Sequence, residues 1–182
     1  MTLEKLAEQG NHNVQVSMAA AIGLKIHEIR KILIKECFTD FQNVEHRLET
    51  VANVHGIAFV NDSRATNINS TWYALETTTR PIIWIDGGVD TGNDYSILRA
   101  VVIKKVKAII SLGIDNQNLI MAFKDLNIPI TTTQSMTEAV DLAYIAGTKG
   151  DTVLLSPACA SFDLFIDYED RGIAFKKAVK NL

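Results

Sequence analysis

From residue 45 onward, short apolar runs alternate with segments whose apolar residues recur at helical spacing. The apolar runs predict strands at 47–54, 57–60, 82–85, 108–112, 128–132 and 152–155. The helical spacing predicts helices at 66–77, 95–102, 116–124, 136–146 and 161–180. The first two strands meet at His55-Gly56 and are expected to form a hairpin. Strands that alternate with helices predict an α/β fold, with a mostly parallel sheet covered by helices on both faces.

The first 43 residues follow a different pattern. The stretch 12–22 is rich in Ala, Met and Val and ends at Gly23, and apolar residues then recur at helical spacing from Ile26 to Leu33. Two helices are expected here. Such a pair cannot form much core by itself, so we expect 1–43 to be a short helical segment that belongs to a preceding domain. Residues 44–182 are then one complete domain.

Composition restricts the function classes. The chain has 182 residues, of which 47% are apolar and 21% charged, and its net charge is −3. This fits a globular protein and argues against a general nucleic-acid binder, which usually carries a basic stripe. We find neither a membrane-spanning apolar run nor a signal peptide in the sequence. Cys37 and Cys159 form no metal-binding pair and fit reduced thiols, so a cytoplasmic location is expected.

Three of the predicted strands lead into loops of small, polar or glycine residues. The loop sequences are Ser-Pro-Ala-Cys-Ala-Ser (156–161), Asn-Asp-Ser-Arg-Ala-Thr-Asn (61–67) and Asp-Gly-Gly (86–88). The carboxyl ends of parallel strands meet at one edge of a sheet, and helix starts there offer free N–H groups to an anion. The pattern therefore predicts one anion-binding crevice at this edge.

Several residues in these loops have two possible roles. Asp62 could hold a magnesium ion or a ribose hydroxyl, and Thr66 could donate to a substrate carboxylate or only cap a helix. His46-Arg47 offers a charged fork for phosphate, or is simply a solvated strand start. Cys159 is better explained as a packing residue than as a nucleophile, because the nearby sequence contains no base for it. Without a P-loop or another catalytic fingerprint, the residues alone indicate an anion-binding α/β domain.

Four segments, taken together, resemble the Mur ligase family. They are His12-Asn13 with the alanines at 19–21, Glu-His-Arg-Leu-Glu at 45–49, the loop at 61–67, and 154–163 followed by Tyr168, Arg171-Gly172 and Phe175. Their order and spacing match the last part of such an enzyme, from about residue 10 to the end. The resemblance implies that 1–43 close the central, ATP-binding domain. It implies that 44–182 form the C-terminal, Rossmann-like domain that brings in the amino acid.

The resemblance is strongest to the family member that adds D-glutamate to UDP-N-acetylmuramoyl-L-alanine in peptidoglycan precursor synthesis. It implies an ATP-dependent amide ligase that works through an acyl phosphate, with ATP and Mg²⁺ bound mainly by the missing central domain. The excerpt alone is expected to be inactive and to hold no metal or catalytic residue of its own. The implied D-glutamate-binding residues are Thr66, Ser161, Phe162, Tyr168 and Thr91. The implied ATP-binding residues are Asn13, Arg47 and Asp62.

Two departures from the family pattern affect this reading. Thr91 stands where family members often have a lysine that pairs with a glutamate carboxylate, and Arg64 is a candidate to compensate. Val16 stands where the family tends to have a second asparagine near the nucleotide. Two alternatives therefore stay open. One is another Mur or folylpolyglutamate-type amino-acid ligase domain, and the other is a stand-alone module that binds a small anion.

Overall fold

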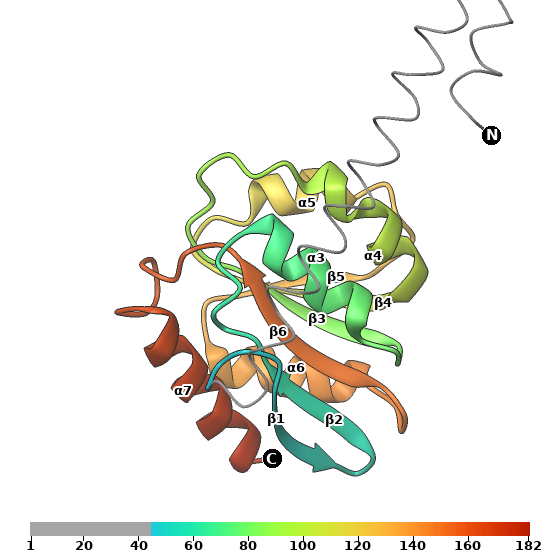
Figure 1. The fold of residues 1–182 in the computed structure, drawn as a ribbon, viewed down its shortest axis with the longest axis vertical. Coiled ribbons are helices and arrows are strands. Elements are labelled where there is room, and N and C mark those ends of the chain that lie inside the picture. Colours follow the sequence, from blue (N-terminus) through green and yellow to red (C-terminus); the bar gives the residue numbers. More distant parts are fainter. Residues whose placement is uncertain (1–44) are drawn as a thin grey trace, which may run out of the picture. The chain divides into compact units, whose positions relative to one another are not determined.

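The computed structural model describes residues 45–182 (Figure 1). The predicted helical pair within 1–43 and the nucleotide contact assigned to Asn13 lie outside the described residues. The elements in chain order are β1 (Glu49–Val54), β2 (Ile57–Asn61), α3 (Ile68–Thr77), β3 (Ile82–Gly87), the 3₁₀ helix η1 (Tyr95–Leu98), α4 (Arg99–Lys105), β4 (Val106–Leu112), α5 (Gln117–Phe123), β5 (Ile130–Thr133), α6 (Met136–Ala146), β6 (Thr152–Ala158) and α7 (Tyr168–Lys180).

The six strands form one sheet in the order β1-β2-β6-β3-β4-β5. Only β1 is antiparallel, and it pairs with β2 through the predicted hairpin at His55-Gly56. The pairs β2–β6, β6–β3, β3–β4 and β4–β5 are all parallel. The α/β class and the mostly parallel sheet predicted from the sequence are therefore confirmed.

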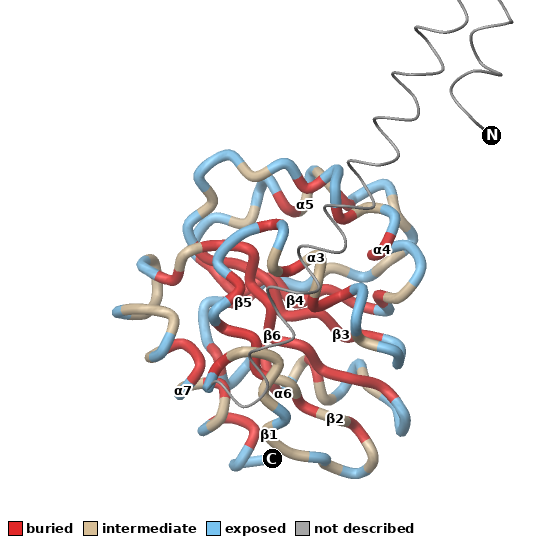
Figure 2. The backbone as a smooth tube through the Cα atoms, in the orientation of Figure 1, coloured by how far each residue is buried: buried red, intermediate tan, exposed pale blue. Residues whose placement is uncertain are grey.

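Helices cover both faces of the sheet, and strand β3 shows why. All its residues are buried, with Ile82 and Trp84 packed in one core cluster and Ile83 and Ile85 in the other. Successive side chains of a strand point to opposite faces, so a central strand needs apolar residues at every position. Helices α3, α4 and α5 pack over the first face, and α6 and α7 pack over the second. Figure 2 shows the buried strands enclosed between these layers.

The predicted helix at 161–180 is wrong in its first part. Strand β6 continues to Ala158, residues 159–167 form a loop, and α7 begins only at Tyr168. The start signal lies at Asp167, whose side chain accepts the backbone N–H of Asp170, and Glu169 and Asp170 add negative charge to the first turn. A helix dipole placed directly after β6, as expected for an anion site, is therefore absent from the described fold.

Other elements also begin or end a few residues from their predicted bounds. The first strand begins at Glu49 rather than at residue 47, because His46 and Leu48 adopt positive φ angles of 64° and 44°, which extended strands exclude. The helix predicted at 95–102 is divided into η1 and α4. Within residues 45–182, no helix is long and apolar enough to cross a membrane.

Candidate functional site

The three polar loops lie at one edge of the sheet, as predicted. They follow β2, β6 and β3, which are adjacent parallel strands, at 62–67, 159–167 and 88–94. The carboxyl ends of adjacent parallel strands, where the strand order reverses, are the usual place for a ligand crevice in α/β sheets. We refer to this side of the molecule as the carboxyl edge.

One buried arginine connects these three loops. Arg171, in the first turn of α7, is 2% exposed. Its Nε donates to Ser63 Oγ at 3.0 Å and its Nη2 donates to the Ser63 carbonyl at 2.8 Å. Its Nη1 donates to the carbonyl oxygens of Cys159 at 3.1 Å and Gly87 at 3.3 Å. The ends of β2, β3 and β6 are therefore held by a single guanidinium, whose rigid fork of donors suits this task.

Direct contacts between the loops complete this arrangement. Val89 N–H donates to the carbonyl of Ala160 at 2.8 Å, and Ser63 Oγ donates to the carbonyl of Tyr168 at 2.7 Å. A Cβ atom on Gly88 would lie 2.1 Å from the Ala160 oxygen, and its φ angle is 125°. This position therefore requires glycine, because only glycine permits both the conformation and the close approach.

Asp62 points into the protein at the end of β2. Its Oδ2 accepts from Ser156 Oγ at 2.9 Å, and its Oδ1 accepts from the backbone N–H of Leu48 at 3.2 Å. Burial raises the pKa of Asp62 to about 7, while these hydrogen bonds and the charge of Arg47 act in the opposite direction. The carboxyl group thus fixes the segment that contains Arg47, which is half-buried.

A second buried carboxyl group, Asp86, was not singled out from the sequence. It is the last residue but one of β3, is 1% exposed, and neither of its side-chain oxygens has a hydrogen-bond partner within residues 45–182. Burial raises its pKa well above the ordinary value, and the charge of Arg171 opposes this. Cys159 lies in the same region, and burial raises the pKa of its thiol to about 12. Its burial and high pKa support the packing role predicted for Cys159.

On the side of β2, Arg64 contacts two of the predicted residues, Thr66 and Tyr168. Thr66 is exposed, and its N–H donates to the carbonyl of Arg64 at 2.9 Å. The guanidinium carbon of Arg64 lies 5.6 Å from the ring centroid of Tyr168, the first residue of α7. The loop after β2 therefore meets the start of α7 at the surface.

On the side of β3 and β6, the remaining predicted residues lie on two loops joined by the Val89–Ala160 contact. Thr91 is exposed, and Ser161 is 2% exposed. The carbonyl of Ser161 accepts the N–H groups of Leu164 and Phe165, which shapes the turn after it. The Phe162 side chain is 73% exposed, which is unusual for a large apolar residue.

The charged fork predicted for His46-Arg47 is wrong for His46. This side chain is 4% exposed, and its Nδ1 lies 2.9 Å from Asn61 Nδ2. A Cβ on Gly172 would lie 2.2 Å from His46 Nδ1, so the imidazole packs directly on the backbone of α7. His46 is therefore a core residue. His55, in the turn of the hairpin, is exposed, and its Nδ1 lies 2.6 Å from Tyr144 Oη.

Two hollows open beside the loop after β3. The first has a volume of about 310 Å³ and is lined by Gly88, Val89, Asp90, Ile114, Asp115, Asn118 and Asp163. The second has a volume of about 560 Å³, shares Asn118, and lies over η1 and α5. Among residues 45–182, no group of three or more His, Cys, Asp and Glu residues could hold a metal ion. Sequence reasoning missed Asn118 because helical spacing does not show which residues rim a hollow.

The mostly parallel sheet and its three linked loops define an α/β domain of the Rossmann-like class, and the comparison with known families identifies its family. Residues 46–159 match the family described as Mur ligase, glutamate ligase domain, so this chain belongs to the Mur ligase family. Its relatives include the UDP-N-acetylmuramoylalanine–D-glutamate ligases of Christiangramia forsetii, 52% identical over 182 residues, and Porphyromonas gingivalis, 53% identical over 182 residues. These alignments cover 100% of this chain but only 41% and 40% of the two relatives.

Solved structures show the same fold at low sequence identity. MurF from Acinetobacter baumannii matches with a TM-score of 0.53 and 16% identity, covering 94% of this chain and 38% of that one. The UDP-N-acetylmuramate–alanine ligase MurC from Thermotoga maritima matches with a TM-score of 0.51 and 14% identity, covering 78% of this chain and 31% of that one. The resemblance to the Mur ligases noted in the sequence is confirmed.

Proposed function

We propose that this chain is the C-terminal, amino-acid-binding part of an ATP-dependent ligase that adds D-glutamate to UDP-N-acetylmuramoyl-L-alanine in the cytoplasm. The observation that carries the proposal is the identity of about half the residues, over the whole chain, to ligases named for this reaction. The chain spans about two-fifths of their length. The rest of the reaction centre is therefore assigned to domains that precede this one.

The carboxyl edge supports the binding half of this proposal. Thr66 and Tyr168 on one side, and Thr91, Ser161 and the backbone at Phe162 on the other, are the proposed contacts of D-glutamate. Arg171 fixes all three loops before any ligand arrives. A site held in this way loses little conformational freedom on binding, which favours affinity for a small, doubly charged amino acid.

The chemistry of the proposal is amide formation in two steps. ATP transfers its γ-phosphoryl group to the free carboxylate of UDP-N-acetylmuramoyl-L-alanine, and ADP leaves. The deprotonated amine of D-glutamate then attacks the carbonyl carbon of the acyl phosphate, the C–N bond forms, and inorganic phosphate departs with the C–O bond electrons. This domain holds and orients the amine, so that attack occurs within one complex rather than from solution.

The nucleotide half of the proposal involves Arg47 and Asn13. Arg47 would reach ATP from the segment that Asp62 fixes through the N–H of Leu48, so Asp62 acts as a positioning residue. Mg²⁺ would be held mainly by the preceding domain, and no step is assigned to it here. Closure of the domains would bring Arg47 and the bound amino acid to the acyl phosphate.

The test is phosphate release by the full gene product with ATP, UDP-N-acetylmuramoyl-L-alanine and D-glutamate. We expect release to require all three substrates. Thr66→Ala should raise the KM for D-glutamate, whereas Thr79→Ala, an exposed threonine at the opposite edge, should not. Release with another amino acid but not D-glutamate would instead indicate a different ligase of this family. A lack of release with any amino acid would favour the stand-alone binding module.

A further inference from the structure

The loops of the carboxyl edge have an unequal charge distribution. Arg64 is the only Lys or Arg in the loops that follow the five parallel strands, at 62–67, 88–94, 113–116, 134–135 and 159–167. The same loops contain six aspartates, which are Asp62, Asp90, Asp94, Asp115, Asp163 and Asp167. A ligand with two carboxylates meets repulsion at such an edge unless a cation offsets it.

The backbone of Arg64 is held by hydrogen bonds, and its side chain is exposed. Its N–H donates to the His46 carbonyl at 3.1 Å, and its carbonyl accepts the N–H of Thr66 at 2.9 Å. The guanidinium carbon lies 5.6 Å from the centroid of the Tyr168 ring, within the range of a cation–π contact. The residue is exposed, and no carboxylate within residues 45–182 forms an ion pair with it.

The other cations near this edge are already engaged. The Arg171 nitrogens donate to Ser63 and to two carbonyl oxygens in the interior. The Lys176 ammonium contacts the carboxylates of Glu45 and Glu49. Arg47 is half-buried, and its charge acts on the carboxyl group of Asp62.

We propose that Arg64 is a specificity-determining residue of this site and binds a carboxylate of the amino-acid substrate through two N–H groups, against the ring of Tyr168. This inference rests on the proposed function, because it assigns a residue to the recognition of D-glutamate. It also explains how an acidic edge with the uncharged Thr91 accepts a dianion. A charge-assisted, two-point contact is the strongest polar interaction that an exposed side chain can offer a carboxylate.

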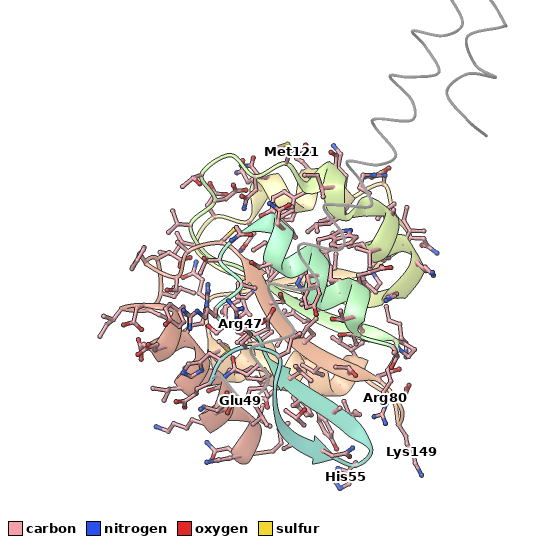
Figure 3. All side chains as sticks on the ribbon, in the orientation of Figure 1. Arg47, Glu49, His55, Arg80, Met121 and Lys149 are labelled. Atoms are coloured by element: carbon pink, nitrogen blue, oxygen red, sulfur yellow. The ribbon has the colours of Figure 1, made fainter. Side chains whose placement is uncertain are left out.

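The experiment measures the KM for D-glutamate by phosphate release from the full gene product, at saturating ATP and UDP-N-acetylmuramoyl-L-alanine. Arg64→Gln should raise KM about 10- to 100-fold with kcat changed less than about threefold, the effect of losing a charge-assisted contact. Arg64→Lys should recover part of the loss. The matched control is Arg80→Gln, at the opposite end of the sheet in Figure 3, which should leave KM unchanged.

Ionic strength supplies a readout that a merely structural role would not move. The KM of the unaltered enzyme should rise with salt, and the KM of Arg64→Gln should rise less, because screening acts on the charge that the variant lacks. An unchanged KM in Arg64→Gln, or a loss of kcat alone, would overturn this proposal while the ligase assignment stands. An unaltered enzyme that releases no phosphate with D-glutamate would instead overturn the proposed function.

Discussion

The two edges of the sheet are built differently. At the carboxyl edge, strand ends meet a continuous set of buried polar groups, including Asp62, Asp86 and Arg171. At the amino edge, the buried polar residues within 45–182 are Asp151 and Thr152. The exposed residues His55, Arg80 and Lys149 lie at that end in Figure 3. Burying polar groups costs free energy unless each finds a partner, and at the carboxyl edge most of them find it in one another, which holds the three loops together.

The largest effect should come from the residue that joins the three loops. Arg171→Met removes donors to Ser63, Gly87 and Cys159 and leaves the buried Asp86 without its neighbouring positive charge. We expect a loss of about 3–5 kcal/mol in the free energy of unfolding, because buried acceptors on Ser63, Gly87 and Cys159 lose their donor. Urea unfolding of the 182-residue chain measures it.

The control for this variant is Arg80→Met at the amino edge. Arg80 is exposed, so its replacement should change the free energy of unfolding by less than about 0.5 kcal/mol. Equal losses in the two variants would contradict the view that the carboxyl edge depends on one buried arginine.

A smaller difference in the free energy of unfolding is expected when two glycines with positive φ are each replaced by alanine. Gly87 ends β3 with a φ of 129°, and an added Cβ would lie 2.1 Å from the Leu112 carbonyl oxygen. Gly150, in the turn before β6, has a φ of 101° and nothing within 4 Å of the same position. Gly87→Ala should therefore cost about 3 kcal/mol, from strain plus backbone displacement, and Gly150→Ala about 1 kcal/mol, from strain alone. Thermal unfolding of the two variants in one buffer compares them, and reversed losses would refute the contrast.

The pH dependence of stability isolates one buried carboxyl group of the carboxyl edge. Burial raises the pKa of Asp62 from 3.8 to about 7, so the unfolded chain loses this proton at lower pH than the folded one. Stability from this group is complete below about pH 4 and decreases as the pH rises to about 7. Asp62→Asn should reduce this slope by at most about 1.4 kcal/mol per pH unit. Asp86 contributes in the same direction, so the slope should diminish without vanishing.

The matched variant for the pH measurement is Asp141→Asn on α6. Asp141 is exposed and far from the buried network, so the pH profile of unfolding should keep its slope. Denaturant midpoints measured from pH 4 to pH 8 give both profiles. A slope that Asp62→Asn leaves unchanged would show that the buried carboxyl does not govern this part of the curve.

The strands of the sheet could be predicted from the sequence because they are short and apolar. A central strand such as β3 carries no polar residue before Asp86. The prediction failed after β6, where small residues in 156–161 looked like a tight turn before a helix. The helix start signal was present further on, with Asp167 as the cap and two acidic residues after it. The helix was predicted to start too early because Phe162 and Phe165 fit helical spacing, although both belong to the loop.

The candidate site was only partly predictable for a different reason. The loops after β2, β3 and β6 could be grouped from strand pattern alone, because parallel strands place their ends together. The strand pattern does not show whether a loop side chain faces water or the interior. His46, for example, is buried although its neighbours in sequence are charged. The burial of Asp86 and Arg171 could not be predicted for the same reason, because the sequence next to an apolar run does not show which way a charged side chain points.

Because one guanidinium holds the ends of three strands, the loops of the carboxyl edge cannot detach one by one. Their amide hydrogens should exchange with solvent through a single cooperative opening, in contrast to the turn at Gly150, which can fray independently. The bases of these loops, at Ser63, Gly87 and Cys159, therefore act as one unit, and a change at any of them is transmitted to the other two.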